Sequence, residues 1–133
     1  MTREAVARWV HEVASRRTDA SFDGYVMVTP DYNHSSSGAL KNAIDFLYAE
    51  WNNKAVGFVS YGSAGGTRAV EHLRLIAAEL QMADVRAQVA LSLFTDFENF
   101  SVFKPSEFQH DALTATLDQV VAWSQALAPL RAG

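Results

Sequence analysis

Two polar segments, residues 30–37 and 62–67, could form one ligand site. Each follows a short apolar run, residues 25–29 and 55–61, and each leads into an amphipathic stretch. In open α/β sheets, loops at the carboxyl ends of parallel strands hold nucleotides or flavins through backbone N–H groups and short side chains. Two such loops at neighbouring strand ends therefore predict a single shared binding site.

Several side chains in and near these segments could take part in catalysis, but the sequence around them favours structural roles. The three serines at 35–37 lack a Gly-x-Ser-x-Gly context, which favours helix capping and turn formation over nucleophilic chemistry. His34, His72 and His110 show no metal-ligand spacing with one another or with carboxylates. Arg68 is interpreted either as part of a solvated helix face or as a contact for dinucleotide phosphates. We therefore predict neither a hydrolase nor a metal site.

The elements that position these segments follow from hydrophobic periodicity. The pattern alternates helix and strand along the whole chain, which predicts a parallel sheet joined by right-handed crossovers. The last strand alternates apolar and polar residues and is therefore expected near an edge, and residues 95–105 are expected to form an aromatic loop. Helices are predicted over 2–17, from 36–38 to 51, over 66–82 and over 106–127, with strands over 25–29, 55–61 and 85–93.

Composition limits the class of protein. The 133 residues are 49% hydrophobic and 20% charged, which is typical of one globular domain spanning residues 1–133. The net charge of −4 gives no basic footprint for nucleic acid or an anionic membrane. The chain has no cysteine, no apolar run long enough to span a bilayer and a charged start. These features predict a cytoplasmic protein without nucleic-acid or membrane partners.

Four segments resemble the NADPH-dependent FMN reductases, flavodoxin-like flavoproteins that include quinone, azo-dye and chromate reductases. Residues 29–35 are similar to the family's Pro-Glu-Tyr-Asn motif, with Asp31 in the glutamate position. Residues 38–45, 60–66 and 103–105 match further segments in family order. The resemblance implies a flavodoxin-like, three-layer α/β/α fold with a parallel sheet, of which three strands are evident here.

The same resemblance implies FMN as cofactor and NADPH or NADH as hydride donor, with a flavin, a quinone or a similar small molecule as electron acceptor. In the family, backbone N–H groups of the two loops contact the isoalloxazine ring. Hydride passes directly between stacked rings, so we expect no catalytic side chain. Carried over by position, the implied cofactor-binding residues are Pro30, Asp31, Tyr32, Asn33, His34, Ser35, Gly62, Ser63, Gly65 and Gly66.

The N-terminal part of the family pattern has no counterpart in the sequence. The family's first strand, its phosphate-binding loop and its second strand are missing, and we expect FMN binding to be weakened as a result. Three interpretations stay open. A homodimer or homotetramer completes the site, favoured by the open edge at residues 25–29; or the chain is a scaffold that has lost FMN and acts as an oligomerising or interaction protein; or the sequence omits segments of a longer protein.

Overall fold

The computed structural model describes residues 4–6, 8–9 and 23–133. Residues 4–6 and 8–9 are helical, and the rest of the helix predicted over 2–17 lies outside the described residues. The remaining elements, in chain order, are β1 (Gly24–Pro30), α2 (Gly38–Asp45), the 3-10 helix η1 (Ala49–Trp51), β2 (Ala55–Gly62), α3 (Thr67–Glu79), β3 (Ala83–Ser92), β4 (Phe97–Glu98), β5 (Val102–Phe103) and α4 (Glu107–Arg131).

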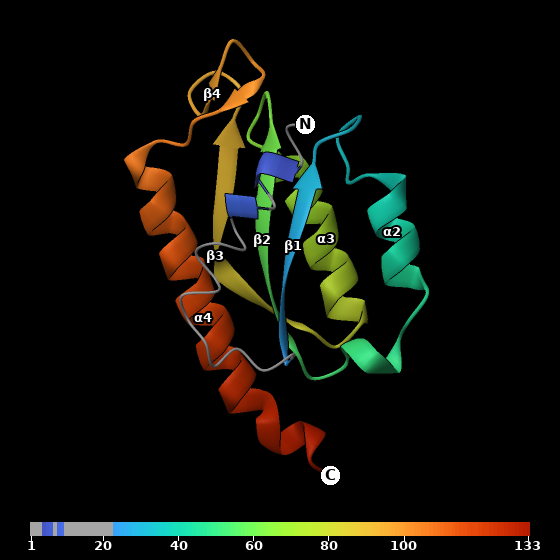
Figure 1. Cartoon of the computed structure of the whole chain (residues 1–133). Helices are drawn as coiled ribbons and strands as arrows, with labels where there is room; N and C mark the ends of the chain where they lie inside the picture. Colours follow the sequence, from blue (N-terminus) through green and yellow to red (C-terminus); the bar gives the residue numbers. More distant parts are fainter. Residues whose placement is uncertain (1–3, 7, 10–22) are drawn as a thin grey trace.

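Strands β1, β2 and β3 form a parallel sheet in that order, and helices cover both of its faces (Figure 1). The predicted three-layer α/β/α architecture is confirmed. The three predicted strands are also confirmed, each one or two residues longer than expected. Strand β3 lies at an edge of the described sheet, as its alternating pattern predicted. No described helix is long and apolar enough to cross a membrane.

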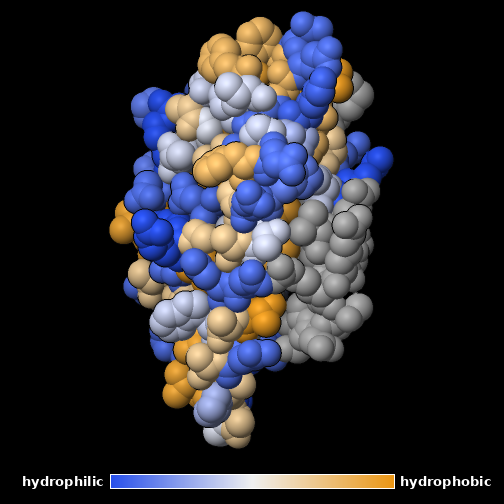
Figure 2. All heavy atoms as spheres, turned by 90° about the vertical axis from the view of Figure 1, so that its left-hand side faces the viewer, coloured by the Kyte–Doolittle hydropathy of each residue, from blue (hydrophilic) through white to orange (hydrophobic). Residues whose placement is uncertain are grey.

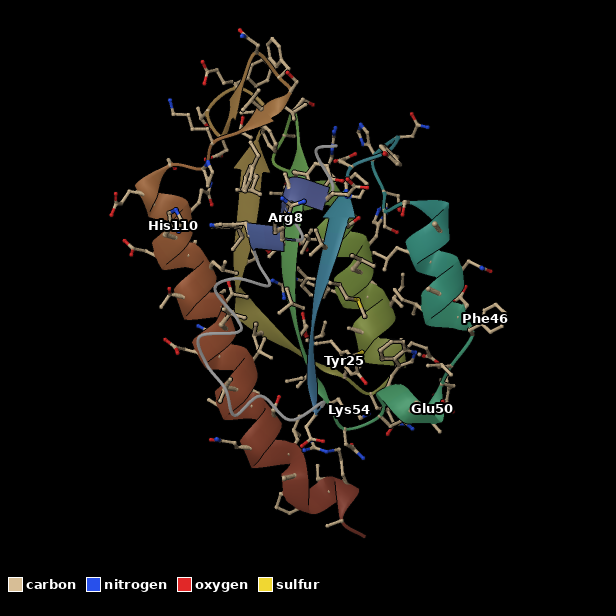
Figure 3. All side chains as sticks on the ribbon, in the orientation of Figure 1. Arg8, Tyr25, Phe46, Glu50, Lys54 and His110 are labelled. Atoms are coloured by element: carbon tan, nitrogen blue, oxygen red, sulfur yellow. The ribbon has the colours of Figure 1, made fainter. Side chains whose placement is uncertain are left out.

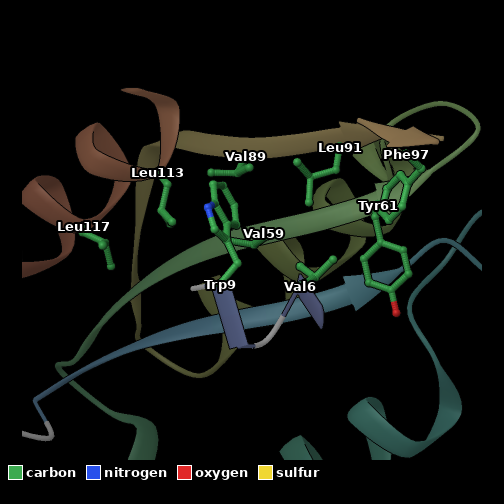
Figure 4. Packing of buried hydrophobic residues seen from close by; sticks show 9 residues of the cluster. All are labelled: Val6, Trp9, Val59, Tyr61, Val89, Leu91, Phe97, Leu113 and Leu117. Carbon is green, nitrogen blue, oxygen red and sulfur yellow. The ribbon is translucent and has the colours of Figure 1, made fainter. Parts of the chain in front are cut away.

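The central strand β2 supplies both hydrophobic cores because its side chains alternate between the two faces. On one face, Val59 and Tyr61 pack with Trp9 of the helical N-terminal residues and with Leu113 of α4 (Figure 4). On the opposite face, Phe58 packs with residues of α2 and α3. Apart from its last residue, β2 is buried throughout, so its near-continuous apolar sequence matches a strand covered on both sides.

Helix α2 is shorter than its apolar stripe predicted. The helix stops at Asp45 instead of continuing to Trp51, and the chain then forms η1. The Trp51 indole N–H donates to the Ile44 carbonyl at 3.0 Å, and the indole packs edge-on against the Tyr25 ring. The apolar stripe is therefore explained by core packing of a bent segment, not by one continuous helix. Phe46 at the bend projects into solvent (Figure 3).

The prediction of an aromatic loop over 95–105 is wrong in part, because β4 and β5 form a short antiparallel hairpin there. The hairpin is supported from outside the segment. The buried Asp96 carboxylate accepts hydrogen bonds from the backbone N–H groups of Ser92 and Ser106 and from the Gln109 amide of α4. Its two short strands are therefore stabilised by distant groups that local periodicity does not reveal. Helix α4 also runs further than predicted, to Arg131, with Pro129 in its last turn.

Ser37 caps α2, as its position before the apolar stripe predicted, by accepting the Leu40 N–H on its hydroxyl oxygen at 3.2 Å. We expect Ser37→Ala to lower the free energy of unfolding by about 1 kcal/mol because the helix loses this cap. Urea denaturation followed by circular dichroism measures the change. Ser36→Ala is the control and should have less than half this effect. Equal losses for the two variants would contradict the capping role.

Candidate functional site

The two polar segments lie at the carboxyl ends of β1 and β2, which meet at the same edge of the parallel sheet (Figure 1). The Asp31 N–H donates to the Tyr61 carbonyl at 3.1 Å. A Cβ placed on Gly62 would lie 3.2 Å from the Asp31 Cβ, so the two segments are in van der Waals contact. The predicted convergence of the two loops is therefore a property of the fold.

The first loop is a tight turn that projects polar groups from the end of β1. Tyr32 and Ser35 exchange both backbone hydrogen bonds, at 2.8 and 3.1 Å. Between them, Asn33 and His34 have φ of 51° and 71°, the left-handed pair of a type I′ turn. Tyr32, Asn33 and His34 are exposed at the tip of this turn. The turn therefore holds them in a fixed backbone geometry beside the second loop.

The second loop requires glycine at its junction with α3. Gly66 has φ of 72°, and a Cβ there would lie 2.6 Å from the Ser60 Cβ and 2.8 Å from the Tyr61 nitrogen. The Ser60 hydroxyl donates to the Gly65 carbonyl at 2.7 Å, and the Gly65 N–H donates to the Gly62 carbonyl at 3.1 Å. The loop is thus packed tightly against the strand from which it emerges.

This loop presents unused hydrogen-bond donors to its surroundings. Ser63 and Ala64 are exposed, and their backbone N–H groups have no acceptor in the part of the chain that the structure describes. They lie four and three residues before Thr67, the first residue of α3, where the helix dipole favours negative charge. The glycines let the loop pack closely against its neighbours, and a partly negative group can approach the exposed donors of Ser63 and Ala64.

Arg68 in the first turn of α3 ties the two loops together. Its Nε donates to the Asp31 carboxylate at 3.0 Å, and its Nη1 lies 2.7 Å from the His34 Nε2. The Asp31 side chain is only 5% exposed, and its other oxygen accepts the His34 N–H at 3.0 Å. Since a guanidinium only donates, His34 accepts this bond on Nε2 and carries its proton on Nδ1. His72 lies 2.9 Å from the Ser35 hydroxyl and supports the far side of the turn.

Every residue predicted for the site lies in these two loops or at their junctions with β1 and β2, with Pro30 closing β1 and Gly62 closing β2. Sequence reasoning missed the role of Arg68, which binds Asp31 and His34 in this structure instead of extending along a solvated helix face. Its place two residues after Gly66, in the helical turn that follows the loop, is the signal that could have identified it.

The fourth matching segment, residues 103–105, supports the hairpin next to the site. Phe103 packs against the rings of Trp9 and Phe97, with centroids 5.5 and 5.3 Å away. The Lys104 N–H donates to the Asp96 carbonyl at 2.8 Å. No cluster of three or more histidine and acidic residues among the described positions could hold a metal ion, and the absence of a metal site stays a prediction.

Comparison with known protein families shows which family has this arrangement of loops and strands. A family model described as NADPH-dependent FMN reductase matches residues 4–96, a stretch that contains both loops and the three parallel strands. The chain belongs to this family. The recognition from the segments at 29–35 and 60–66 is confirmed.

Curated relatives match most of this FMN reductase family member. An NAD(P)H-dependent FMN reductase from Nectria sp is 36% identical over 99 residues, covering 71% of this chain and 46% of the relative. An NAD(P)H-dependent FMN reductase from Schizosaccharomyces pombe is 39% identical over 95 residues, covering 71% of this chain and 44% of the relative. The chain therefore spans about half the length of these two relatives.

A solved structure shares the fold of this FMN reductase family member. The flavoenzyme NAD(P)H:(acceptor) oxidoreductase FerB from Paracoccus denitrificans superposes with a TM-score of 0.62 at 21% identity. The match covers 88% of this chain and 68% of that chain. At this level of identity the likeness supports the flavodoxin-like fold, which agrees with the observed parallel sheet between helical layers.

Proposed function

We propose that the two loops bind the isoalloxazine ring of FMN and that the chain acts as an NAD(P)H-dependent FMN reductase. The proposal rests on the convergence of the turn at 32–35 and the glycine-rich loop at 62–66, in a chain of this family. The matched relatives are named NAD(P)H-dependent FMN reductases and, in other cases, quinone reductases. We therefore infer a flavin, a quinone or a similar small molecule as the electron acceptor.

The residues present fit a flavin ring. Its carbonyl oxygens need donors, which the N–H groups of Ser63 and Ala64 provide, and the glycines give the loop the compact backbone that carries these groups. The exposed turn at 32–35 offers a second wall. We propose the cofactor-binding set Pro30, Asp31, Tyr32, Asn33, His34, Ser35, Gly62, Ser63, Gly65 and Gly66.

Bound FMN would supply two-electron chemistry, in which NAD(P)H and one proton reduce the acceptor by two electrons and two protons and NAD(P)⁺ is released. The chain contributes binding and orientation. The free N–H groups of Ser63 and Ala64 and the N-terminus of α3 stabilise negative charge on the adjacent ligand. Arg68 holds the turn at 32–35 in place through Asp31 and His34. No side-chain acid or base is required, so we assign no catalytic residue.

We further propose a cytoplasmic homodimer or homotetramer without nucleic-acid or membrane partners. The net charge of −4 supports the absence of a polyanionic partner. In the described sheet, β1 is an edge strand and its outer side has no paired strand among the described residues. Such an edge favours association with a second copy, which would add groups close to the site.

A turnover assay tests the activity. The full chain is mixed with FMN, NADPH or NADH, and 1,4-benzoquinone, and the loss of absorbance of the reduced nicotinamide is followed. We expect a rate that is proportional to protein concentration and depends on added FMN. A rate equal to that of the protein-free mixture with both nucleotides would contradict the proposed reaction.

A further inference from the structure

Phe94, in the turn between β3 and β4, and Phe100, in the turn between β4 and β5, are exposed to solvent although they pack against each other. Phe94 and Phe100 are 67% and 61% exposed, with ring centroids 5.5 Å apart and ring planes at 87°. Hydrophobic side chains gather at the end of the molecule where Figure 1 places this hairpin (Figure 2). This exposed edge-to-face pair of Phe94 and Phe100 is called the aromatic corner below.

The backbone of Phe100 is strained. Ser101 donates its N–H to the Glu98 carbonyl at 3.1 Å, which closes a turn whose central residues, Asn99 and Phe100, have φ of 51° and 58°. A type I′ turn favours glycine at its second central position, and a bulky aromatic in the left-handed region is an outlier. The side chain recovers little of this cost by burial, since it is mostly exposed. Such strain at an exposed position points to a role in binding.

The aromatic corner lies beside the glycine-rich loop. The N–H of Leu93, the residue before Phe94, donates to the Gly62 carbonyl at 3.1 Å. The hairpin below the corner is fixed, because the buried Asp96 carboxylate binds Ser92, Ser106 and Gln109. The buried Phe97 continues into the core (Figure 4). The two exposed rings are therefore held on a rigid base next to one of the two ring-binding loops.

We propose that Phe94 and Phe100 form a binding site for a planar, uncharged aromatic electron acceptor of the quinone class. This inference rests on the proposed reductase function and names a specificity site for it. Perpendicular rings allow a flat molecule to stack on one face while it meets the edge of the other ring. On the same hairpin, the exposed side chains of Glu98 and Lys104 form an ion pair with 3.9 Å between nitrogen and oxygen, so their charges offset each other and an uncharged ring is favoured.

The test is a titration of the full chain with 1,4-naphthoquinone, in which the backbone amide chemical shifts are monitored by NMR. The titration is carried out with and without FMN. The chain has no cysteine, so thiol addition does not complicate the titration. We expect the largest shifts at residues 94 and 99–101. Phe100→Gly should weaken binding about tenfold by removing one stacking surface. Its melting temperature should stay equal or rise, because glycine adopts the left-handed backbone without strain.

Two control variants separate stacking from backbone effects. Asn99→Gly relieves the same type of turn strain and keeps both rings, and Phe108→Ala removes a phenylalanine that is 72% exposed on α4. Both should bind naphthoquinone like the wild type. Equal affinity of the wild type and Phe100→Gly, shifts confined to other residues, or a change in oligomeric state in place of binding would each overturn the proposal. If naphthoquinone binds at the corner while FMN turnover is absent, the aromatic site stands and the reductase proposal falls.

Discussion

Replacing Gly66 by alanine is expected to lower the free energy of unfolding by about 3 to 4 kcal/mol. The left-handed φ of 72° costs an L-residue about 1–2 kcal/mol, and a new Cβ 2.6 Å from the Ser60 Cβ and 2.8 Å from a backbone nitrogen forces local repacking of similar size. For a chain of this length the loss corresponds to a melting temperature lower by about 10 to 15 °C. Differential scanning calorimetry measures the shift.

Gly38→Ala is the matched control for this prediction. Gly38 lies in α2, and a Cβ built on it has no heavy atom within 4 Å. Alanine suits a helix better than glycine, so this variant should be neutral or more stable by up to about 1 kcal/mol. If the two alanine variants lost similar stability, the tight junction between β2 and α3 would not be the structural requirement that we infer.

Arg68→Ala is expected to cost about 2 kcal/mol of stability and to weaken FMN binding at least tenfold. Removing the guanidinium leaves the Asp31 carboxylate, 5% exposed, without its cationic partner. We place the cost below that of a fully buried pair because the Arg68 side chain is itself 41% exposed. The turn at 32–35 also loses its link to α3 through His34. Chemical denaturation and flavin fluorescence titration measure the two effects.

The pair is tested by a double-mutant cycle with Asp31→Asn. Once Asp31 is neutral, loss of Arg68 should cost clearly less than it does in the wild type. Lys41→Ala serves as the control, since Lys41 and Asp45 form an exposed ion pair within α2 that is worth a few tenths of a kcal/mol. Additive losses in the cycle would show that Arg68 acts on the fold independently of Asp31.

The sequence was sufficient to predict the elements whose signals are local. In the sequence, the three parallel strands appear as apolar runs that end in turn residues. Ser37 is one of the serines that stand just before an apolar stripe, where a helix cap is expected. The convergence of the two loops follows from parallel topology alone, because successive strand ends then share one edge of the sheet. The family-specific segments at 29–35 and 60–66 added the flavin interpretation.

The features that sequence reasoning missed depend on contacts between distant residues. Arg68 and Asp31 are 37 positions apart, and nothing local distinguishes this arginine from one on a solvated helix face. The two strands of the hairpin β4–β5 have only two residues each, which is too short for a periodic pattern. The hairpin is stabilised instead by Asp96, which binds Gln109 of α4. Helix α2 ends early because Trp51 packs back onto Ile44 and Tyr25, a tertiary effect that its apolar spacing could not show.

The central claim, that the loops at 32–35 and 62–66 bind a flavin ring, is tested most directly by titrating FMN with the full chain and following its fluorescence. Gly38→Ala is titrated in parallel as a structural control, and Arg68→Ala as the variant expected to bind more weakly. We predict quenching that saturates near one flavin per chain, with retained affinity in the first variant and at least tenfold weaker binding in the second. Absence of quenching at tens of micromolar chain, with the protein folded, would contradict the claim.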